Sequence, residues 1–499
     1  GEAHYSFTLA PTLGFDHAEA TGAALPADYE LAAWAPDALL GPAWPAIYAA
    51  LGSAIHNDYP VIEGLLNAVH LDHSITLEYT PEQMLERGIT TIDVTSHVAA
   101  VDESSSGRIV TVALELTSNG EYVGSTQERF AIRGRATGNR APSEAAPFGG
   151  ANVEVVDTPR SVLRRVTVKA PDDMTPFAIV SGDYNPIHTS YAAAKVAGMD
   201  APLVHGMWLS ATAQHAAEAV VAGQGGAQIA GWTYYMYGTV DLNDEVEITV
   251  ERVGRVVGGG LSLEVTCRIN KQVVSRASAY TFAPKVAYVY PGQGIQSAGM
   301  GLDERTKSKA VDEVWRRADA HTRSAMGFSI LAIVRDNPTE IVARGVTYRH
   351  PEGVLNLTQF TQVALATLAI GQTARMREEG VLVPGAAFAG HSLGEYDALA
   401  AYAEVFPLEI VLDLVFQRGS TMHSLVPRDE KGRSNYRMGA LRPNQFGIDD
   451  AHVVEYVESI AQASGEFLQI VNFNLAGQQY AVAGTVAGLK ALEEDATKR

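Results

Sequence analysis

Hydrophobic and polar residues alternate in four successive runs in the first third of the chain. Such alternation is typical of β-strands with one buried face. It predicts strands over Ser74–Tyr79, Ile89–Val101, Arg108–Leu116 and Tyr122–Ile132. A helical pattern precedes them around Trp44–Val69, and the residues before that helix look irregular. Residues 1–137 are therefore predicted to form one unit, a helix followed by an antiparallel sheet.

The same order of elements recurs in residues 153–284. The pattern predicts a strand at Val162–Val168, a helix over Met207–Val221, and four further strands over Ile229–Val240, Glu245–Val256, Leu261–Asn270 and Gln272–Phe282. Residues 138–152 between the two regions are small, polar and rich in Gly and Pro, which favours a linker. A long helix across a curved antiparallel sheet is the hot-dog plan. Two such units in tandem, a double hot dog, are expected to pack side by side as a fused pseudo-dimer.

The pattern changes after Pro284. Val286–Tyr290 has the character of a short buried strand, and helical stretches then alternate with short apolar runs such as Ala386–Ala389 and Leu468–Val471. Helices alternating with buried strands indicate an α/β domain with a parallel sheet. The predicted fold class is therefore α+β tandem hot-dog domains followed, over residues 285–499, by an α/β domain that is incomplete at its C-terminus.

Composition narrows the range of functions. The chain has 499 residues and a formal net charge of −20, and an acidic surface disfavours both nucleic acid and anionic lipid. Its one cysteine, Cys267, rules out a disulfide within the chain and fits the reducing cytoplasm. We find no apolar run long enough for a membrane span and no signal peptide. Both ends look cut from a longer protein, so we expect an interior fragment.

Acid–base chemistry is suggested by the segment Ser181-Gly-Asp-Tyr-Asn-Pro-Ile-His188. Dehydration of a 3-hydroxyacyl thioester needs a base for the C2 proton, an acid for the leaving hydroxyl and donors for the thioester oxygen. Asp183 and His188 lie five residues apart in a loop that can direct both into one cleft. Gly206 stands where a helix should begin, so its N–H can face the thioester oxygen. Asp-Tyr-Asn-Pro is also good turn chemistry, and composition alone favours a plain turn.

The full string, with His205-Gly206-Met207 following in order, closely resembles the signature of the MaoC-like, R-specific enoyl hydratase and dehydratase family. The resemblance implies that Asp183 and His188 are the catalytic pair. It further implies that Asn185 fixes the loop and that Gly206 supplies the oxyanion contact. Which of the pair moves which proton is left open. The assignment we favour makes His188 the base and Asp183 the acid.

The first hot-dog-like region has no such string. Its His70 and His73 have no acid–base loop around them, and third and fourth metal ligands are not evident. We therefore expect a non-catalytic half that builds the acyl tunnel, and no metal. No Gly-x-Gly-x-x-Gly unit follows a strand, so we expect no nucleotide redox cofactor.

A second candidate site lies in the last region, at Gly390-His-Ser-Leu-Gly394. This Gly-x-Ser-x-Gly pattern between an apolar run and a helical stretch is typical of a nucleophile elbow, which exposes Ser392 at a helix N-terminus. The pattern also fits any α/β-hydrolase. Arg418, 26 residues later, can hold a free carboxylate in bidentate fashion, although an arginine on a helix is usually a solvated charge.

Together with Tyr290-Pro-Gly-Gln-Gly294, Leu357–Leu365 and the Asn-Phe-Asn segment at 472–474, these motifs resemble the malonyl/acyl transferase family. The resemblance implies that Ser392 is the nucleophile, Arg418 the carboxylate clamp, and the backbones of Gln293 and Leu393 the oxyanion hole. The family's catalytic histidine has no counterpart here, since His391, His423 and His452 lie in other contexts. We expect that histidine beyond residue 499.

A MaoC-like dehydratase directly ahead of a malonyl-transferase-type domain resembles the order in the fungal β-chain and in bacterial type I fatty acid synthases. We identify the chain as a fragment of such a synthase, of the bacterial, actinobacterial-like kind. That resemblance implies substrates carried on the phosphopantetheine of an acyl carrier domain and on coenzyme A. It implies malonyl-CoA and long-chain acyl-CoA as transfer partners, and reductases and a ketosynthase as neighbours in a homo-oligomeric megacomplex.

Two alternatives stay open. A polyketide synthase segment uses the same two chemistries, and the chain-length preference of the dehydratase separates it from a fatty acid synthase. An enoyl-CoA hydratase fused to an inactive transferase-like scaffold is a different class of protein. Acylation of Ser392 by malonyl-CoA separates the active transferase from that scaffold.

Overall fold

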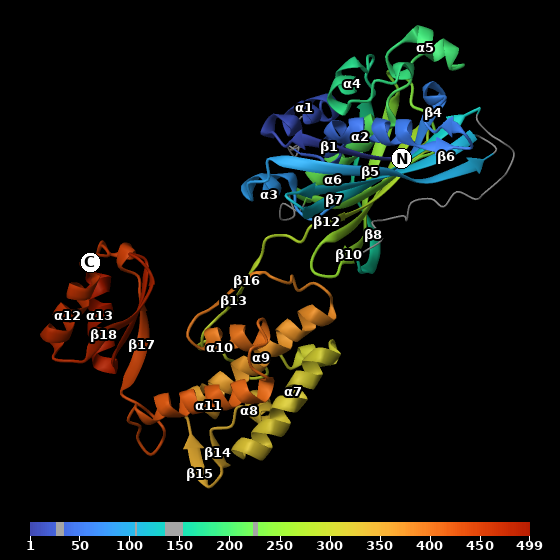
Figure 1. Ribbon diagram of the computed structural model, residues 1–499. Coiled ribbons are helices and arrows are strands. Elements are labelled where there is room, and N and C mark those ends of the chain that lie inside the picture. Colours follow the sequence, from blue (N-terminus) through green and yellow to red (C-terminus); the bar gives the residue numbers. More distant parts are fainter. Residues whose placement is uncertain (26–33, 105–106, 135–152, 223–227) are drawn as a thin grey trace. The chain divides into compact units, whose positions relative to one another are not determined.

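The computed structural model describes residues 1–25, 34–104, 107–134, 153–222 and 228–499. The chain divides into two compact units (Figure 1). The first comprises Gly1–Val286 with Gly380–Gly385, and the second comprises Ala287–Glu379 with Ala386–Arg499. The predicted linker at 138–152 lies outside the described residues, and the predicted boundaries at 137, 153 and 284 stay predictions.

One continuous antiparallel sheet forms the first unit. Its strand order is β1-β5-β6-β7-β4-β9-β12-β11-β10-β8. One half of the sheet contains β1 (Glu2–Thr8), β4 (Ala68–Leu77), β5 (Thr91–Ser104), β6 (Gly107–Ser118) and β7 (Glu121–Arg133). The other half contains β8 (Val155–Lys169), β9 (Ile229–Met236), β10 (Glu245–Val256), β11 (Leu261–Ile269) and β12 (Gln272–Thr281). The halves join where β4 pairs with β9, with Asp72 opposite Tyr235.

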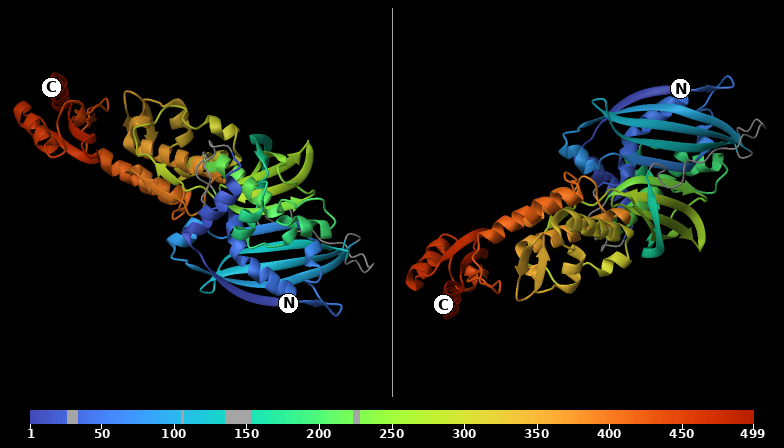
Figure 2. Two further views of the ribbon diagram at one scale, coloured as in Figure 1. Left: turned by 90° about the horizontal axis from the view of Figure 1, so that it is seen from above. Right: turned by 90° about the horizontal axis from the view of Figure 1, so that it is seen from below.

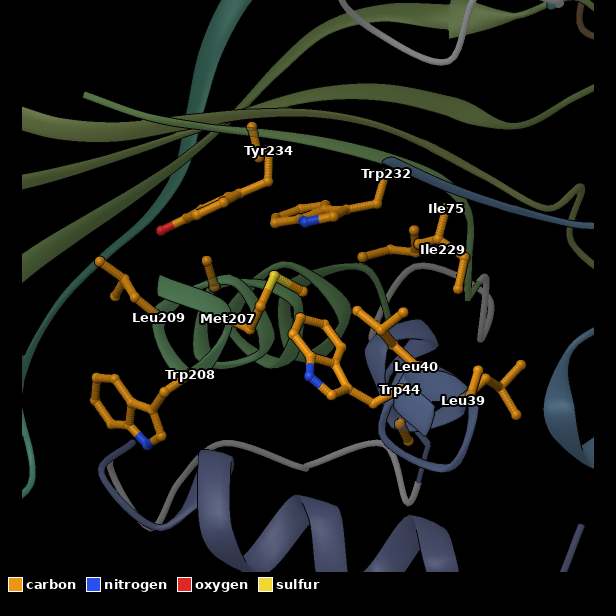
Figure 3. Close-up of a cluster of buried hydrophobic side chains, with 14 of the residues drawn as sticks. Leu39, Leu40, Trp44, Ile75, Met207, Trp208, Leu209, Ile229, Trp232 and Tyr234 are labelled. Atoms are coloured by element: carbon orange, nitrogen blue, oxygen red, sulfur yellow. The ribbon is translucent and has the colours of Figure 1, made fainter. Parts of the chain in front are cut away.

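Each half of the sheet carries one long helix. Helix α2 (Leu40–Ser53) packs on β1, β5 and β6, and α6 (Gly206–Ala222) packs on β8, β9, β10 and β11. Side chains from both helices and from the strands gather in one buried cluster, which includes Trp44, Trp208 and Trp232 (Figure 3). Burial of each large apolar side chain contributes about 1.5–3 kcal/mol. The shorter helices of this unit are α1 (Pro11–Gly22), α3 (Pro81–Glu86), α4 (Thr175–Ser181) and α5 (Tyr191–Val196).

The structure has the predicted strands of both halves, and β10 has the predicted bounds. The helix expected around Trp44–Val69 is wrong in its second part, because α2 ends at Ser53 and a short hairpin follows. Asn57 and Asp58 both have positive φ at its turn, the backbone of a tight two-residue hairpin turn. The start of the chain is not irregular, since it forms β1 and α1. Strand β1 is an edge strand that buries only Phe7, so it leaves almost no alternating pattern.

The second unit contains a parallel pair of strands, β13 (Ala287–Tyr290) and β16 (Ala387–Gly390). Helix α10 (Leu393–Ala401) packs on both strands, and α9 (Thr358–Glu378) packs against α10, α11 (Leu408–Ser424) and α7 (Lys309–His321). The unit also has α8 (Ile330–Asp336) and the hairpin of β14 (Glu340–Ala343) with β15 (Val346–Arg349). The prediction of a buried first strand is wrong. Only two parallel strands pair in the described residues, so Val289 is 73% exposed.

A three-stranded sheet lies near the end of the chain, in the second unit. It has the order β17-β19-β18, formed by β17 (Tyr436–Leu441), β18 (Leu468–Leu475) and β19 (Gln479–Thr485), with helices α12 (Val453–Ser464) and α13 (Val486–Lys498). All its pairings are antiparallel, so the assignment of Leu468–Val471 to a parallel sheet is wrong. A four-residue apolar run does not reveal strand direction. In the part of the chain that the structure describes, no helix is long and apolar enough to cross a bilayer. Figure 2 gives two further views of the ribbon, in which the long strands of the first-unit sheet can be followed.

Candidate active sites

The loop between α4 and α5 carries three of the predicted dehydratase residues. Helix α4 ends at Ser181 and is capped by Gly182, whose φ of 68° is left-handed. A Cβ at Gly182 would lie 3.1 Å from the carbonyl oxygen of Gly41. Glycine suits this turn because it has no Cβ, so it adopts a positive φ without strain and leaves room for the Gly41 carbonyl. The Asn185 side chain then caps the short helix Pro186–His188. The local sequence thus turns the chain sharply and places Asp183, Asn185 and His188 on one compact loop.

The carboxylate of Asp183 is held by donors from both halves of the unit. Its Oδ1 accepts hydrogen bonds from the Tyr48 hydroxyl at 3.0 Å and from the Asn185 backbone N–H at 3.1 Å. The Asn185 side-chain amide donates to the carbonyl of Leu65 at 3.4 Å. Because Tyr48 and Leu65 belong to the first half, the loop is fixed against the half that lacks the motif.

His188 is oriented by one hydrogen bond from its ring. Its Nδ1 lies 2.8 Å from the carbonyl oxygen of Leu203. A carbonyl only accepts, so Nδ1 carries the proton and Nε2 keeps a lone pair in the neutral ring. Burial, partly offset by the charge of Asp183, lowers the pKa of His188. His188 is therefore held neutral at physiological pH, with a basic nitrogen available.

One cavity brings the four predicted dehydratase residues together. Its wall includes Asp183, Asn185, His188 and Gly206, with side chains from both halves, among them Trp44, Tyr48, His70, Phe130, Tyr234 and Met236. Gly206 begins α6, and a Cβ there would lie 2.3 Å from the sulfur of Met236. A larger residue would require the Met236 side chain to move. With glycine here, no side chain separates the first N–H groups of the helix from the cavity.

His205, which precedes Gly206 in the motif, is a further residue of the site whose role the motif did not predict. Its ring stacks on His188 with centroids 3.8 Å apart, and its Nε2 lies 3.1 Å from the Asp183 carbonyl oxygen. Burial, together with the nearby His188, lowers the pKa of His205 to about 3, so it stays neutral. Ligand atoms of Asp183, His188 and His205 lie within 4.8 Å of one another. The ring nitrogens of two stacked imidazoles point along nearly parallel planes, which is poor geometry for one shared metal ion.

A buried charge network lies in the first half of the unit, and its Asp37 also accepts hydrogen bonds from Ser210 at 2.7 Å and Gln214 at 2.6 Å on α6 of the second half. His73 lies between two carboxylates, with Nε2 2.8 Å from Asp37 Oδ1 and Nδ1 2.6 Å from Glu128 Oε1. The network extends to His70, whose Nε2 lies 2.8 Å from Glu128 Oε2. Burial opposes a charge on His73, but the two carboxylates outweigh it and raise the pKa of His73 to about 10. Sequence reasoning found no partners for these histidines because Asp37 and Glu128 lie far from both along the chain.

The second candidate site has the backbone of a nucleophile elbow. Ser392 stands immediately before α10 with φ 57° and ψ −109°, a strained conformation for a residue with a side chain. The flanking glycines allow the turn to close. A Cβ at Gly390 would lie 2.1 Å from the Gly394 backbone, and a Cβ at Gly394 would lie 2.0 Å from the Tyr290 carbonyl oxygen. The elbow therefore presents Ser392, which is exposed, at the end of β16.

Arg418 contacts the predicted nucleophile directly. Its Nη2 donates to Ser392 Oγ at 2.9 Å, and its Nη1 donates to Gln362 Oε1 at 2.8 Å. Gln362 in turn donates to the Thr358 hydroxyl at 2.9 Å, which donates to the Gln293 side chain at 2.8 Å. This chain of hydrogen bonds fixes the guanidinium beside the hydroxyl. Gln362 and Thr358 lie in the segment quoted for the family resemblance, but their role as supports of Arg418 was not predicted.

The predicted oxyanion residues flank the same elbow. Leu393 is the first residue of α10, and a Cβ on Gly292, next to Gln293, would lie 3.7 Å from the Cβ of Ser392. None of the three histidines considered for the base has a hydrogen bond to Ser392 among the described residues. His391 Nε2 lies 3.5 Å from the Asn472 amide, and His452 pairs with Asp449.

Two domain families match the chain over these two sites. Residues 152–272 match the MaoC like domain, and residues 287–492 match the acyl transferase domain. The chain therefore has a MaoC-like hot-dog domain followed by an acyltransferase domain, which confirms the predicted fold class and the predicted classes of dehydratase and acyltransferase.

Several curated relatives of the chain are named as fatty acid synthase beta subunits. The beta subunit stcK of Emericella nidulans is 33% identical over 65% of this chain and 19% of its own length. The fatty acid synthase subunit beta of Saccharomyces cerevisiae is 34% identical over 64% of this chain and 18% of its own length. The chain is thus a homologue of fungal fatty acid synthase beta subunits and spans just under a fifth of their length.

Among solved structures, HtdX of Mycobacterium tuberculosis aligns over 56% of this chain and 99% of its own, at 15% identity and a TM-score of 0.40. FabD of Acinetobacter baumannii aligns over 43% of this chain and 58% of its own, at 28% identity and a TM-score of 0.34.

Proposed function

We propose that the first unit dehydrates (3R)-3-hydroxyacyl thioesters to trans-2-enoyl thioesters. The observation that carries this proposal is the cavity in which Asp183, His188 and the start of α6 at Gly206 meet. An acid, a base and helix N–H donors in one apolar-walled cavity are the groups that this elimination needs. The homology to fatty acid synthase beta subunits supports the same reaction.

In the proposed mechanism, His188 Nε2 takes the proton from C2 while N–H groups at the start of α6 stabilise charge on the thioester oxygen. Asp183, in its carboxylic acid form, gives a proton to the C3 hydroxyl, which leaves as water as the C2–C3 double bond forms. The low pKa of His188 and its Nδ1–H bond to Leu203 support the role as base. Transfer of the proton from His188 back to Asp183 completes the cycle.

The second unit is proposed to transfer malonyl and long-chain acyl groups between coenzyme A and an acyl carrier through an ester on Ser392. Arg418 is proposed to bind the malonyl carboxylate, and the N–H groups of Gln293 and Leu393 to bind the oxyanion. The strained elbow and the Arg418–Ser392 contact support these roles. A second function for this unit, an inactive scaffold, is disfavoured by that pre-organised contact.

The larger assembly is also a proposal. Substrates attached to the phosphopantetheine of an acyl carrier domain, reductase and ketosynthase neighbours, and a homo-oligomeric complex are expected from the kinship with fatty acid synthase subunits. The two relatives described above are fungal, so they support a fatty acid synthase fragment but lend no support to the bacterial, actinobacterial-like assignment. The cytoplasmic location stays a prediction from the single cysteine.

The lowered pKa of His188 predicts the pH profile of dehydration. A base must be neutral to accept a proton, and an ordinary histidine becomes protonated below about pH 6.5. Because burial lowers the pKa of His188, the acidic limb of kcat/KM that reports this histidine is expected below that value. The measurement is kcat/KM between about pH 4 and pH 8 in buffers of constant ionic strength. A midpoint for that limb above about 6.5 contradicts the role of His188 as the base.

Arg418 is expected to set the acyl preference of Ser392. Arg418→Ala removes the carboxylate partner and keeps the nucleophile, so malonyl loading should fall at least about tenfold more than palmitoyl loading. The measurement is made on a longer native chain that carries the catalytic histidine expected for Ser392. It is the fraction of acylated Ser392, by mass spectrometry, after incubation with each acyl-CoA. Arg317→Ala, which removes a surface pair with Glu409 in the same unit, is the control. Equal losses for both donors would show that Arg418 is structural.

A further inference from the structure

Tyr48 is the residue of the non-catalytic half that reaches the dehydratase loop most directly. It lies on α2, where Trp44, Ile47, Tyr48 and Leu51 form one face of the cavity wall. Its hydroxyl donates to Asp183 Oδ1 at 3.0 Å across 135 positions of sequence. The MaoC like match covers residues 152–272 and so does not include it.

The hydrogen bonds on Asp183 distinguish its two oxygens. Oδ1 accepts from two donors, the Tyr48 hydroxyl and the Asn185 N–H. An oxygen that accepts two hydrogen bonds is the carbonyl-like oxygen of a carboxylic acid, so the proton of the acid form belongs on Oδ2. Oδ2 lies 3.9 Å from Nε2 of His205, which burial keeps neutral, so this ring places no charge beside Oδ2. Oδ2 is therefore the oxygen left to give a proton to a substrate.

Tyr48 is a constant donor over the whole working pH range. Burial raises the pKa of Tyr48 above its ordinary value, and the charge of Asp183 raises it further whenever that carboxyl is ionised. The phenol therefore keeps its proton and continues to donate to Oδ1. The Tyr48 ring packs edge-on against the ring of Trp44 on the same helix, with the two ring centroids 6.1 Å apart.

We propose that Tyr48 is a positioning residue for the dehydration, which directs the transferable proton of Asp183 to Oδ2 and so makes the first hot-dog half part of the active site. The inference rests on the proposed function of Asp183 as the acid. The proposed role affects only one of the two bonds that break in the reaction, the C3–O bond. Tyr48 assists cleavage of the C3–O bond, where the hydroxyl must receive a proton, and does not assist removal of the C2 proton by His188.

A pair of substrates tests this role. A 3-hydroxyacyl thioester needs an acid to release water. Its 3-chloro analogue, with the leaving group in the same position in space at C3, releases chloride without a proton. Tyr48→Phe is expected to lower kcat for the hydroxy substrate about tenfold or more, with KM within about twofold, and to leave elimination of chloride within about twofold. Any unfolded fraction lowers both rates equally, so the ratio of the two rates is unaffected by a loss of stability.

The control is Tyr79→Phe, which removes a tyrosine–carboxylate hydrogen bond to Glu121 at 2.8 Å outside the cavity of the same unit. It should leave both rates unchanged. Equal losses for the two substrates in Tyr48→Phe, or no loss for either, would overturn the positioning role. Asp183→Ala and His188→Ala are measured beside it. If they lose activity while Tyr48→Phe does not, only this inference fails. If they keep wild-type rates, the proposed function itself fails.

Discussion

Replacing Asp183 or His188 with alanine is expected to lower the rate of dehydration at least about 10²-fold, the usual contribution of a positioned acid or base. Both side chains face one cavity, and each is held by partners that do not move a proton, the Tyr48 hydroxyl on Asp183 and the Leu203 carbonyl on His188. The change removes the reacting group and leaves the hydrophobic core intact. The measurement is the steady-state rate on a 3-hydroxyacyl pantetheine thioester, with the fold checked by circular dichroism.

Asp172→Ala is the matched control, because Asp172 is an exposed carboxylate eleven positions before Asp183 and does not line the cavity. It should keep the wild-type rate. Near-normal rates in both Asp183→Ala and His188→Ala would contradict the assignment of the catalytic pair.

The second large effect is expected on stability. His73→Leu leaves the carboxylates of Asp37 and Glu128 buried without their shared cation, and breaking a buried ion pair in this way typically costs about 3–5 kcal/mol. The measurement is the free energy of unfolding of the first unit in urea, followed by tryptophan fluorescence. His4→Leu is the control, because that histidine is 70% exposed beside Glu2. A loss below about 1 kcal/mol in His73→Leu would contradict the account of the network.

The same network predicts how stability depends on pH. The folded pKa of His73 is raised, so its contribution is fully present below about pH 6.5 and is lost as the pH rises through about 10. The folded pKa values of Asp37 and Glu128 are lowered despite burial, chiefly by His73. Their contribution is present above the ordinary carboxyl range and is lost as the pH falls below it. The free energy of unfolding should therefore be greatest between the acidic range, where the two carboxylates become protonated, and about pH 10, where His73 loses its charge. In His73→Leu, the fall of this free energy at alkaline pH should become smaller.

Sequence predicts the contacts between site residues that are close together along the chain, and it does not predict those between residues that are far apart. Asp183, Asn185 and His188 lie within six positions, so one loop motif predicts that they meet, and they line one cavity. Tyr48 meets the same loop from 135 positions away. No periodicity or motif predicts such a contact, because it depends on how the two halves of the sheet join at β4 and β9.

Two further elements show the same limit. The strands of the hot-dog halves alternate clearly because one face packs on a helix, whereas β1 buries a single residue and gives no signal. In the transferase unit, the Gly-x-Ser-x-Gly pattern predicts the elbow because its geometry is local. The hydrogen-bonded support of Arg418 by Gln362 depends on packing between α9 and α11 and could not be predicted.

The most direct test of the central claim is formation of the enoyl product by this chain itself. The protein is incubated with a (3R)-3-hydroxyacyl pantetheine thioester, and loss of water is followed by mass spectrometry and by the ultraviolet absorbance of the conjugated thioester. The account predicts product with the wild type and at an equal rate with Ser392→Ala, because the two sites act independently, and none above background with the Asp183→Ala, His188→Ala double variant. No product with the wild type, or equal product with the double variant, would contradict it.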